Sequence, residues 1–115
     1  MLSRKFRLRK KEEISRIFQR GSFVSGHDFV FKFLPNKSSQ IRVAVIIGKK
    51  LCKSAVARNR IRRRLREVVR LNFDSLPTGF DLLVIARTLD LREINFTKLN
   101  QDFLTLVQKW ISKNS

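Results

Sequence analysis

Arginine dominates the segment from Ala57 to Arg70, ARNRIRRRLREVVR, in which seven of the fourteen residues are arginines and Glu67 is the single carboxylate. Guanidinium groups bind phosphate through paired hydrogen bonds, whereas a lysine ammonium acts as a point charge. The chain has 115 residues, with 26 Lys and Arg against 9 Asp and Glu, and its net charge is +17. This excess predicts a surface for a polyanion, and a nucleic acid is favoured over an anionic membrane or a passive charged surface.

Few residues offer acid–base or metal chemistry. His27 is the only histidine, and on a strand its neighbour Asp28 would point to the opposite face. The chain has no Tyr, and its only cysteine, Cys52, is expected to be a small packing residue. No Cys and His cluster has the spacing of a zinc site. We therefore expect no catalytic residue and no metal site in this chain.

Hydrophobic periodicity predicts the elements that position the arginines. Ile14, Ile17 and Phe18 have helical spacing over residues 11–20, and Gly21 predicts the end of that helix. Four segments have the alternating or wholly apolar pattern of strands: residues 22–25, 27–35, 41–48 and 80–87. We expect the first to be a short edge strand, the second and third to form a hairpin, and the fourth to be central.

Two further helices are expected. The arginine segment predicts a helix from an N-cap at Ser54 to about Asn72, with a buried stripe of Ala57, Ile61, Leu65, Val68 and Val69. The opposite side then carries Asn59, Arg62, Arg63, Arg66 and Arg70. Asn95 is expected to cap a last helix whose apolar stripe is Leu99, Phe103, Leu106, Val107, Trp110 and Ile111. Because neighbouring arginines repel one another, packing of the apolar stripe must hold the arginine helix in place.

Together these elements predict one RNA-binding domain over residues 1–115, of fold class α+β: a small α/β sandwich with helices packed on a mixed central sheet. Neither a secretory signal nor a membrane span is recognisable, so the expected location is cytoplasmic. Strands precede the arginine helix, where a DNA-binding helix-turn-helix would have a partner helix. RNA accepts a broad basic helix through shape and phosphate contacts and is therefore favoured over DNA.

The segment GKKLCKSAVARNRIRRRLRE resembles the signature of the bacterial ribonuclease P protein subunit, in which a Lys pair after a strand leads into a helix with Arg-Asn-Arg, basic residues and Arg-Glu. The segments RLRKKEEISRIFQRG and DLLVIAR also fit, so the resemblance covers most of the chain. It implies a ribosomal protein S5 domain 2-like fold of order α-β-β-(β)-α-β-α, with a left-handed crossover between parallel strands. By the general rule alone we would expect a right-handed one.

The resemblance also implies a function and two sets of residues. In that family the protein binds a catalytic RNA, and this RNA with its Mg²⁺ ions cleaves precursor tRNA to make the mature 5′ end. The residues assigned to the catalytic RNA are Lys49, Lys50, Arg58, Asn59, Arg60, Arg62, Arg63 and Arg66. Those assigned to a cleft for the single-stranded 5′ leader are Ile14, Phe18, Lys32 and Arg87. The implied protein binds no cofactor alone and has no catalytic group.

Two positions depart from the family pattern. Many members have aromatic residues where this chain has Ile14 and Lys32. Because stacking contributes about 1–3 kcal/mol per base, their absence would shift the cleft toward charge contacts. Phe18 matches an aromatic position of the cleft, and simple core packing is an equal alternative for it. A ribosomal protein or general RNA chaperone is the alternative function, and a transcription factor is a third.

Overall fold

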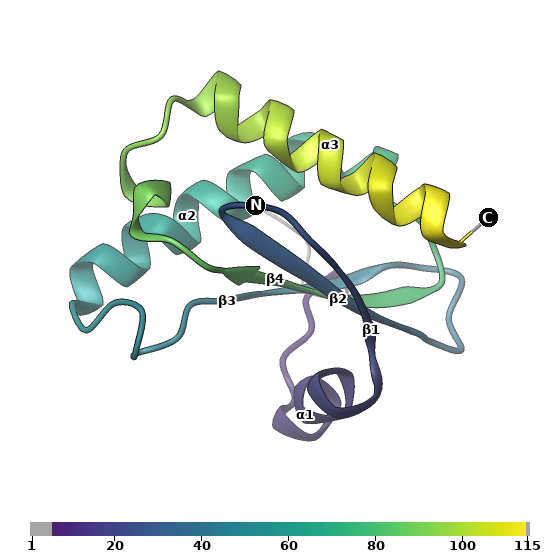
Figure 1. Ribbon diagram of the computed structural model, residues 1–115. Helices are drawn as coiled ribbons and strands as arrows, with labels where there is room; N and C mark the ends of the chain where they lie inside the picture. Colours follow the sequence, from purple (N-terminus) through teal and green to yellow (C-terminus); the bar gives the residue numbers. More distant parts are fainter. Residues whose placement is uncertain (1–5, 115) are drawn as a thin grey trace.

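A four-stranded sheet with helices on both faces makes up the described part of the chain, residues 6–114 of the computed structural model (Figure 1). The helices and strands in chain order are α1 (Lys11–Arg20), β1 (Ser22–Ser25), β2 (Phe29–Pro35), β3 (Arg42–Ile46), α2 (Ala55–Leu71), β4 (Phe80–Ala86) and α3 (Phe96–Asn114). Two short 3-10 segments, η2 (Phe73–Ser75) and η3 (Leu89–Arg92), flank β4. The expected α+β class and element order are confirmed. Residues 1–5 and 115 of the predicted domain lie outside the described residues.

The strands are arranged in the order β1-β2-β4-β3. β2 is antiparallel to both β1 and β4, whereas β3 is parallel to β4. The predicted hairpin between residues 27–35 and 41–48 is wrong, because β4 lies between these two strands. Leu82, Leu83 and Val84 are fully buried in β4, which explains its central position. The chain therefore crosses from β3 through α2 to a parallel neighbour, and the left hand of this crossover stays a prediction.

The main core lies between the sheet and the two helices α2 and α3, which Figure 1 shows on the same side. Phe31 and Phe33 of β2 meet Phe103 and Trp110 of α3, with ring centroids 4.8 to 6.1 Å apart. The stripe predicted for α3 is buried from Leu99 to Trp110, but Ile111 is exposed. This core therefore fixes α3 and α2 against one face of the sheet.

In the described part of the chain, the opposite face of the sheet is covered by α1 and by Leu8 of the segment before it (Figure 1). Ile17 of α1 packs on Leu83 and Leu8, and Ile14 lies at the edge of this second, smaller core. Arg42 of β3 donates hydrogen bonds to Asp81 at 2.7 and 2.9 Å and to Glu13 of α1 at 2.9 Å. These bonds hold α1 across the ends of β3 and β4.

The predicted helix caps are confirmed. Ser54 Oγ accepts a hydrogen bond from the Ala57 amide at 3.2 Å, and Asn95 Oδ1 accepts one from the Thr97 amide at 2.8 Å. The prediction for His27 and Asp28 is wrong, since β2 begins only at Phe29 and both residues lie in the preceding turn. Strand alternation does not apply there, and His27 Nε2 lies 3.9 Å from Asp28 Oδ1.

Candidate nucleic-acid interface

Helix α2 presents its arginines because its apolar side is anchored in the main core. Ile61, Leu65, Val68 and Val69 are fully buried, as the sequence pattern predicts, and Ala57 is half-buried. Burying such a side chain contributes about 1.5–3 kcal/mol. This packing offsets the repulsion between arginines three and four positions apart, which is a few tenths of a kcal/mol per pair.

The side of α2 that faces away from the core forms what we call the outer face, composed of Asn59, Arg62, Arg63 and Arg66. Together with Val56 these residues line a shallow hollow. Arg62 Nη1 donates a hydrogen bond to Asn59 Oδ1 at 2.8 Å, which orients its guanidinium along the surface. None of the ion pairs found among residues 6–114 includes Arg62, Arg63 or Arg66. The outer face is therefore a cationic surface without internal neutralisation.

Three other arginines of α2 are bound to backbone carbonyls instead, and we call them the carbonyl-bound arginines: Arg58, Arg60 and Arg64. Arg58 Nη1 donates to the carbonyls of Cys52 and Lys53 at 2.9 and 3.0 Å. Arg60 Nε donates to the Arg92 carbonyl at 3.0 Å. Arg64 donates to the carbonyls of Leu91, at 2.8 Å, and Ile94. These side chains tie α2 to the loop before it and to the segment around η3.

The electrostatics of α2 favour an anionic ligand. Partial burial lowers the pKa of Arg66 below its usual value, and the charges of Arg62 and Arg7 lower it further. Burial followed by the charge of Arg60 likewise lowers the pKa of Arg64. Arg7 Nε is buried and has no hydrogen-bond partner in the described part of the chain. A phosphate placed beside these guanidinium groups would relieve the repulsion among them.

The remaining residues predicted to contact RNA precede α2. Lys49 and Lys50 lie in the turn after β3, and both are exposed. Sequence reasoning missed Arg7, which lies beside β3 through a parallel bridge to Val43. The basic run at residues 4–11 marks this part of the chain as cationic, but it has no periodicity that would place Arg7 against α2.

Three of the four predicted cleft residues lie together at α1. Lys32 Nζ donates a hydrogen bond to the Phe18 carbonyl at 2.8 Å and lies 5.5 Å from the centroid of the Phe18 ring. The Phe18 side chain is 41% exposed, while Ile14 is half-buried against the smaller core. Arg87 instead donates to the Gly26 carbonyl at 2.9 Å, beyond the end of β4, and no hydrogen bond joins it to the other three.

Comparison with known proteins decides the family. The family model described as Ribonuclease P matches residues 2–110. The ribonuclease P protein component of Chloroflexus aggregans is 38% identical over 103 residues, which cover 90% of this chain and 76% of that protein. The one from Petrotoga mobilis is 33% identical over 109 residues, covering 92% of each chain. The chain belongs to the ribonuclease P protein family.

Solved structures of ribonuclease P proteins have the same fold. The protein from Thermotoga maritima has a TM-score of 0.80 at 28% identity, covering 90% of this chain and 96% of that one. The protein from Staphylococcus aureus has a TM-score of 0.76 at 26% identity, covering 90% and 93%. The resemblance seen in the sequence is confirmed, and the relatives give no support to a ribosomal protein. In residues 6–114 of this ribonuclease P protein, no helix is long and apolar enough to cross a membrane.

Proposed function

We propose that this ribonuclease P protein binds the catalytic RNA of the enzyme through the outer face of α2, and the 5′ leader of precursor tRNA at the end of α1. The observation that carries the proposal is the outer face itself, where none of the carboxylates of residues 6–114 forms an ion pair with Arg62, Arg63 or Arg66. On an RNA backbone each of these guanidinium groups can fork onto a phosphate.

The chemical step in this proposal belongs to the RNA and to the Mg²⁺ ions bound by it. The protein contributes by lowering the repulsion among phosphates of the RNA and between the RNA and its substrate. Each phosphate that a guanidinium neutralises releases counterions, so the protein should matter most where Mg²⁺ and salt are scarce. The outer face, with Lys49 and Lys50 ahead of it, is the surface proposed to carry this effect.

The leader is proposed to bind beside Phe18 and Lys32. The exposed part of the Phe18 ring offers one stacking surface for a base. Lys32 is held against the same ring and the last turn of α1, so its charge lies where the family pattern implied by the resemblance has an aromatic residue. We therefore expect this protein to recognise the leader by one stacked base together with phosphate contacts.

Reconstitution tests the proposal directly. The RNA subunit from the same genome is combined with precursor tRNA at low Mg²⁺, with and without this chain, and the rate of 5′ cleavage is measured. We expect faster cleavage with the protein, and the gain should shrink when Arg62 and Arg66 are changed to Ala. Lys37→Ala removes an exposed charge from the loop between β2 and β3, outside the proposed RNA-binding residues, and serves as the control for single changes at Arg62 and Arg66.

Two results would overturn the proposal. One is a cleavage rate unaffected by the protein. The other is a gain that is the same with leader-bearing, leaderless and unrelated RNAs, which is the behaviour of a general RNA chaperone.

A further inference from the structure

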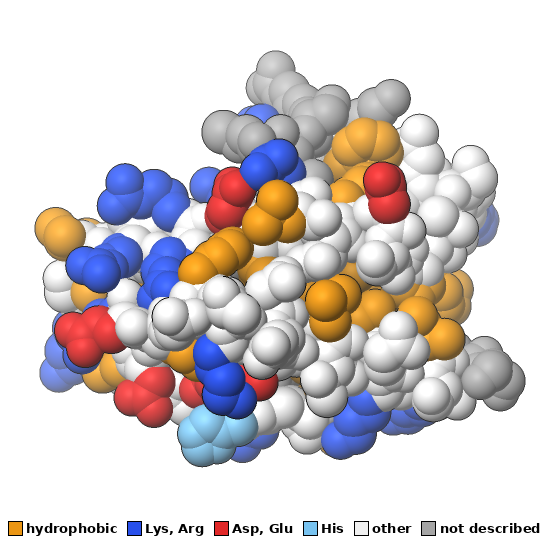
Figure 2. Space-filling model, turned by 90° about the horizontal axis from the view of Figure 1, so that it is seen from above, with side chains coloured by type: hydrophobic (Ala, Val, Ile, Leu, Met, Phe, Trp, Pro, Cys, Tyr) orange, Lys and Arg blue, Asp and Glu red, His pale blue; other side chains and the backbone are white. Residues whose placement is uncertain are grey.

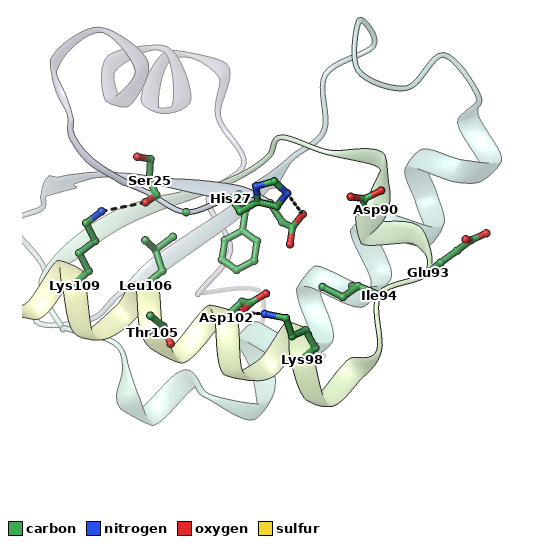
Figure 3. Close-up of a pocket in the computed structure, with 13 residues that line it drawn as sticks. Ser25, His27, Asp90, Glu93, Ile94, Lys98, Asp102, Thr105, Leu106 and Lys109 are labelled. Carbon is green, nitrogen blue, oxygen red and sulfur yellow. Dashed lines mark hydrogen bonds and ion pairs between the residues drawn. The ribbon is translucent and has the colours of Figure 1, made fainter.

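An acidic pocket lies between the β1–β2 turn, η3 and α3 (Figure 3). Its volume is about 710 Å³. Four of the nine carboxylates of this +17 chain line it: Asp28, Asp90, Glu93 and Asp102. Lys98 neutralises Asp102 at 2.9 Å, which leaves an acidic end around His27. Figure 2 shows the pale-blue histidine with both acidic and basic side chains beside it.

Strand pairing brings these groups together. β2 and β4 are antiparallel with Phe29 opposite Ala86, so the turn before β2 lies beside the segment after β4. The Arg87 amide donates to the Asp28 carbonyl at 2.8 Å, so the hydrogen bonding between the two segments continues for one residue beyond the strands. η3 follows two residues later and places Asp90 next to the turn.

Three side chains with potential metal-ligand atoms meet at this junction. One nitrogen of His27 and one carboxylate oxygen each of Asp28 and Asp90 all lie within 4.8 Å of one another. The His27 side chain is 84% exposed, so little packing holds its imidazole in place. In Figure 3 the side chains of His27 and Asp90 project from neighbouring loops at the same rim of the pocket.

The Asp28 carboxylate is an independent sign of a cationic ligand. Its side chain is only 6% exposed, and its Oδ1 accepts a hydrogen bond from Thr88 Oγ1 at 2.7 Å. Asp28 lines the pocket, and the hydrogen bonds found among residues 6–114 leave its other carboxylate oxygen available for a ligand. A buried carboxylate is costly unless it is paired or coordinates a metal. The Thr88 hydroxyl holds it in orientation, as outer-shell partners of metal ligands do.

We propose that His27, Asp28 and Asp90 bind one divalent transition-metal ion of the Zn²⁺ class. One imidazole and two carboxylates supply three protein ligands, and water completes the coordination. The imidazole favours Zn²⁺, Co²⁺ or Ni²⁺ over Mg²⁺, which prefers oxygen ligands and keeps most of its water. The site is thus distinct from the Mg²⁺ ions of the RNA. Ligand bonds of about 2.0–2.2 Å require the three groups to draw closer, and the mobile partner is His27.

The metal would stabilise the segment on which α2 rests. Asp90 lies in η3, and its carbonyl accepts the amides of Glu93 and Ile94 at 3.0 and 2.9 Å. The carbonyls that receive Arg60 and Arg64 belong to Leu91, Arg92 and Ile94 of the same segment. An ion at Asp90 therefore fixes one side of a segment whose other side holds two arginines of α2.

The test uses the full chain without RNA, so its outcome is independent of the proposed function. Zn²⁺ is titrated by calorimetry, and Co²⁺ is titrated while its visible absorption reports the coordinating atoms. We expect one ion per chain and a raised unfolding temperature. His27→Ala and Asp90→Asn should each weaken binding by about 10-fold or more, because even outer-shell partners are worth 10–100-fold.

Two variants serve as matched controls. Glu93→Gln removes a charge from the same pocket outside the proposed ligand set, and Cys52→Ser removes the only thiol. Both should bind Zn²⁺ as the unaltered chain does. His27 is a surface side chain, so His27→Ala should fold normally, which circular dichroism checks. No stoichiometric binding, binding that survives both His27→Ala and Asp90→Asn, or binding that is lost in Cys52→Ser would overturn the proposal.

Discussion

The arginines of α2 divide into two groups that differ in what they touch. The carbonyl-bound arginines Arg58, Arg60 and Arg64 donate to backbone oxygens of neighbouring segments. Arg62, Arg63 and Arg66 of the outer face have no carboxylate partner in the described part of the chain. The same residue type on the same helix therefore stabilises the fold on one side and leaves a charged surface on the other.

Arginines of one basic motif can therefore have different functions. The resemblance assigns Arg58 and Arg60 to the RNA together with Arg62, but their guanidinium groups already have partners in the protein. A donor that satisfies a carbonyl contributes to folding, because the carbonyl would otherwise lack a partner. A guanidinium group has five N–H donors, so the bonds to these carbonyls do not use up the hydrogen-bonding capacity of either arginine.

The largest effect is expected when the outer face is removed. Changing Arg62, Arg63 and Arg66 together to Ala should lower the slope of log affinity against log salt by about 2–3 units, because each phosphate contact contributes nearly one. Affinity for the catalytic RNA should fall most at low salt. Filter binding over a salt series measures both quantities.

Folding provides the control for this variant. Its unfolding temperature should stay the same or rise, because the change removes like-charge repulsion at spacing three and four. An unchanged salt slope would show that the RNA does not contact the outer face.

For Arg64 we expect the opposite result, a loss of stability with little change in RNA binding. Arg64→Ala leaves the carbonyls of Leu91 and Ile94 without their donor, so the free energy of unfolding should fall by about 1–3 kcal/mol. The salt slope of RNA binding should change little. Its exposed neighbour Arg63 is the matched control, since Arg63→Ala should alter stability by less than about 0.5 kcal/mol. Urea unfolding of both variants measures the difference, and equal stability would remove the distinction between the two groups.

Local features of the fold were predictable from the sequence. The bounds of α1, the caps at Ser54 and Asn95 and the buried stripe of α2 follow from helical periodicity and capping chemistry, which depend on residues close in sequence. The strand order was not predictable in the same way. An apolar strand such as β3 reveals that it is buried but not which strand lies beside it, so the expected hairpin missed the insertion of β4.

In the candidate site, too, the features that depend on residues close in sequence were predictable and those that depend on distant residues were not. Helical spacing correctly placed Arg62, Arg63 and Arg66 on one side of α2. It could not predict the partners of Arg60 and Arg64, which lie 27 to 32 residues further along the chain. The proximity of His27 and Asp28 was missed because the strand was expected to begin two residues too early.

At the end of α1, as on α2, a cation bound within the protein lies beside a group that is exposed to a ligand. Lys32 is bound to the Phe18 carbonyl, whereas the Phe18 ring is partly exposed. Phe18→Ala should weaken binding of leader-bearing precursor tRNA by about 1 kcal/mol, the lower end for one stacked base. Binding of leaderless tRNA should change less. Gel-shift affinities with both substrates measure this, and an equal loss for the two would assign Phe18 to core packing alone.

The smallest effect concerns Arg70, which unlike the outer face has a carboxylate partner. Arg70 donates to both Glu67 oxygens, and this hydrogen bonding, with the Arg70 charge, lowers the pKa of Glu67 from 4.5. A lowered pKa in the folded state means that the pair stabilises above the unfolded pKa, and this contribution is lost as pH falls through the folded pKa. Glu67→Gln should therefore lower the unfolding temperature slightly near neutral pH and not in strong acid. Thermal unfolding at both pH values measures the difference, and a gap that persists in acid would show that the pair acts through packing and not through charge.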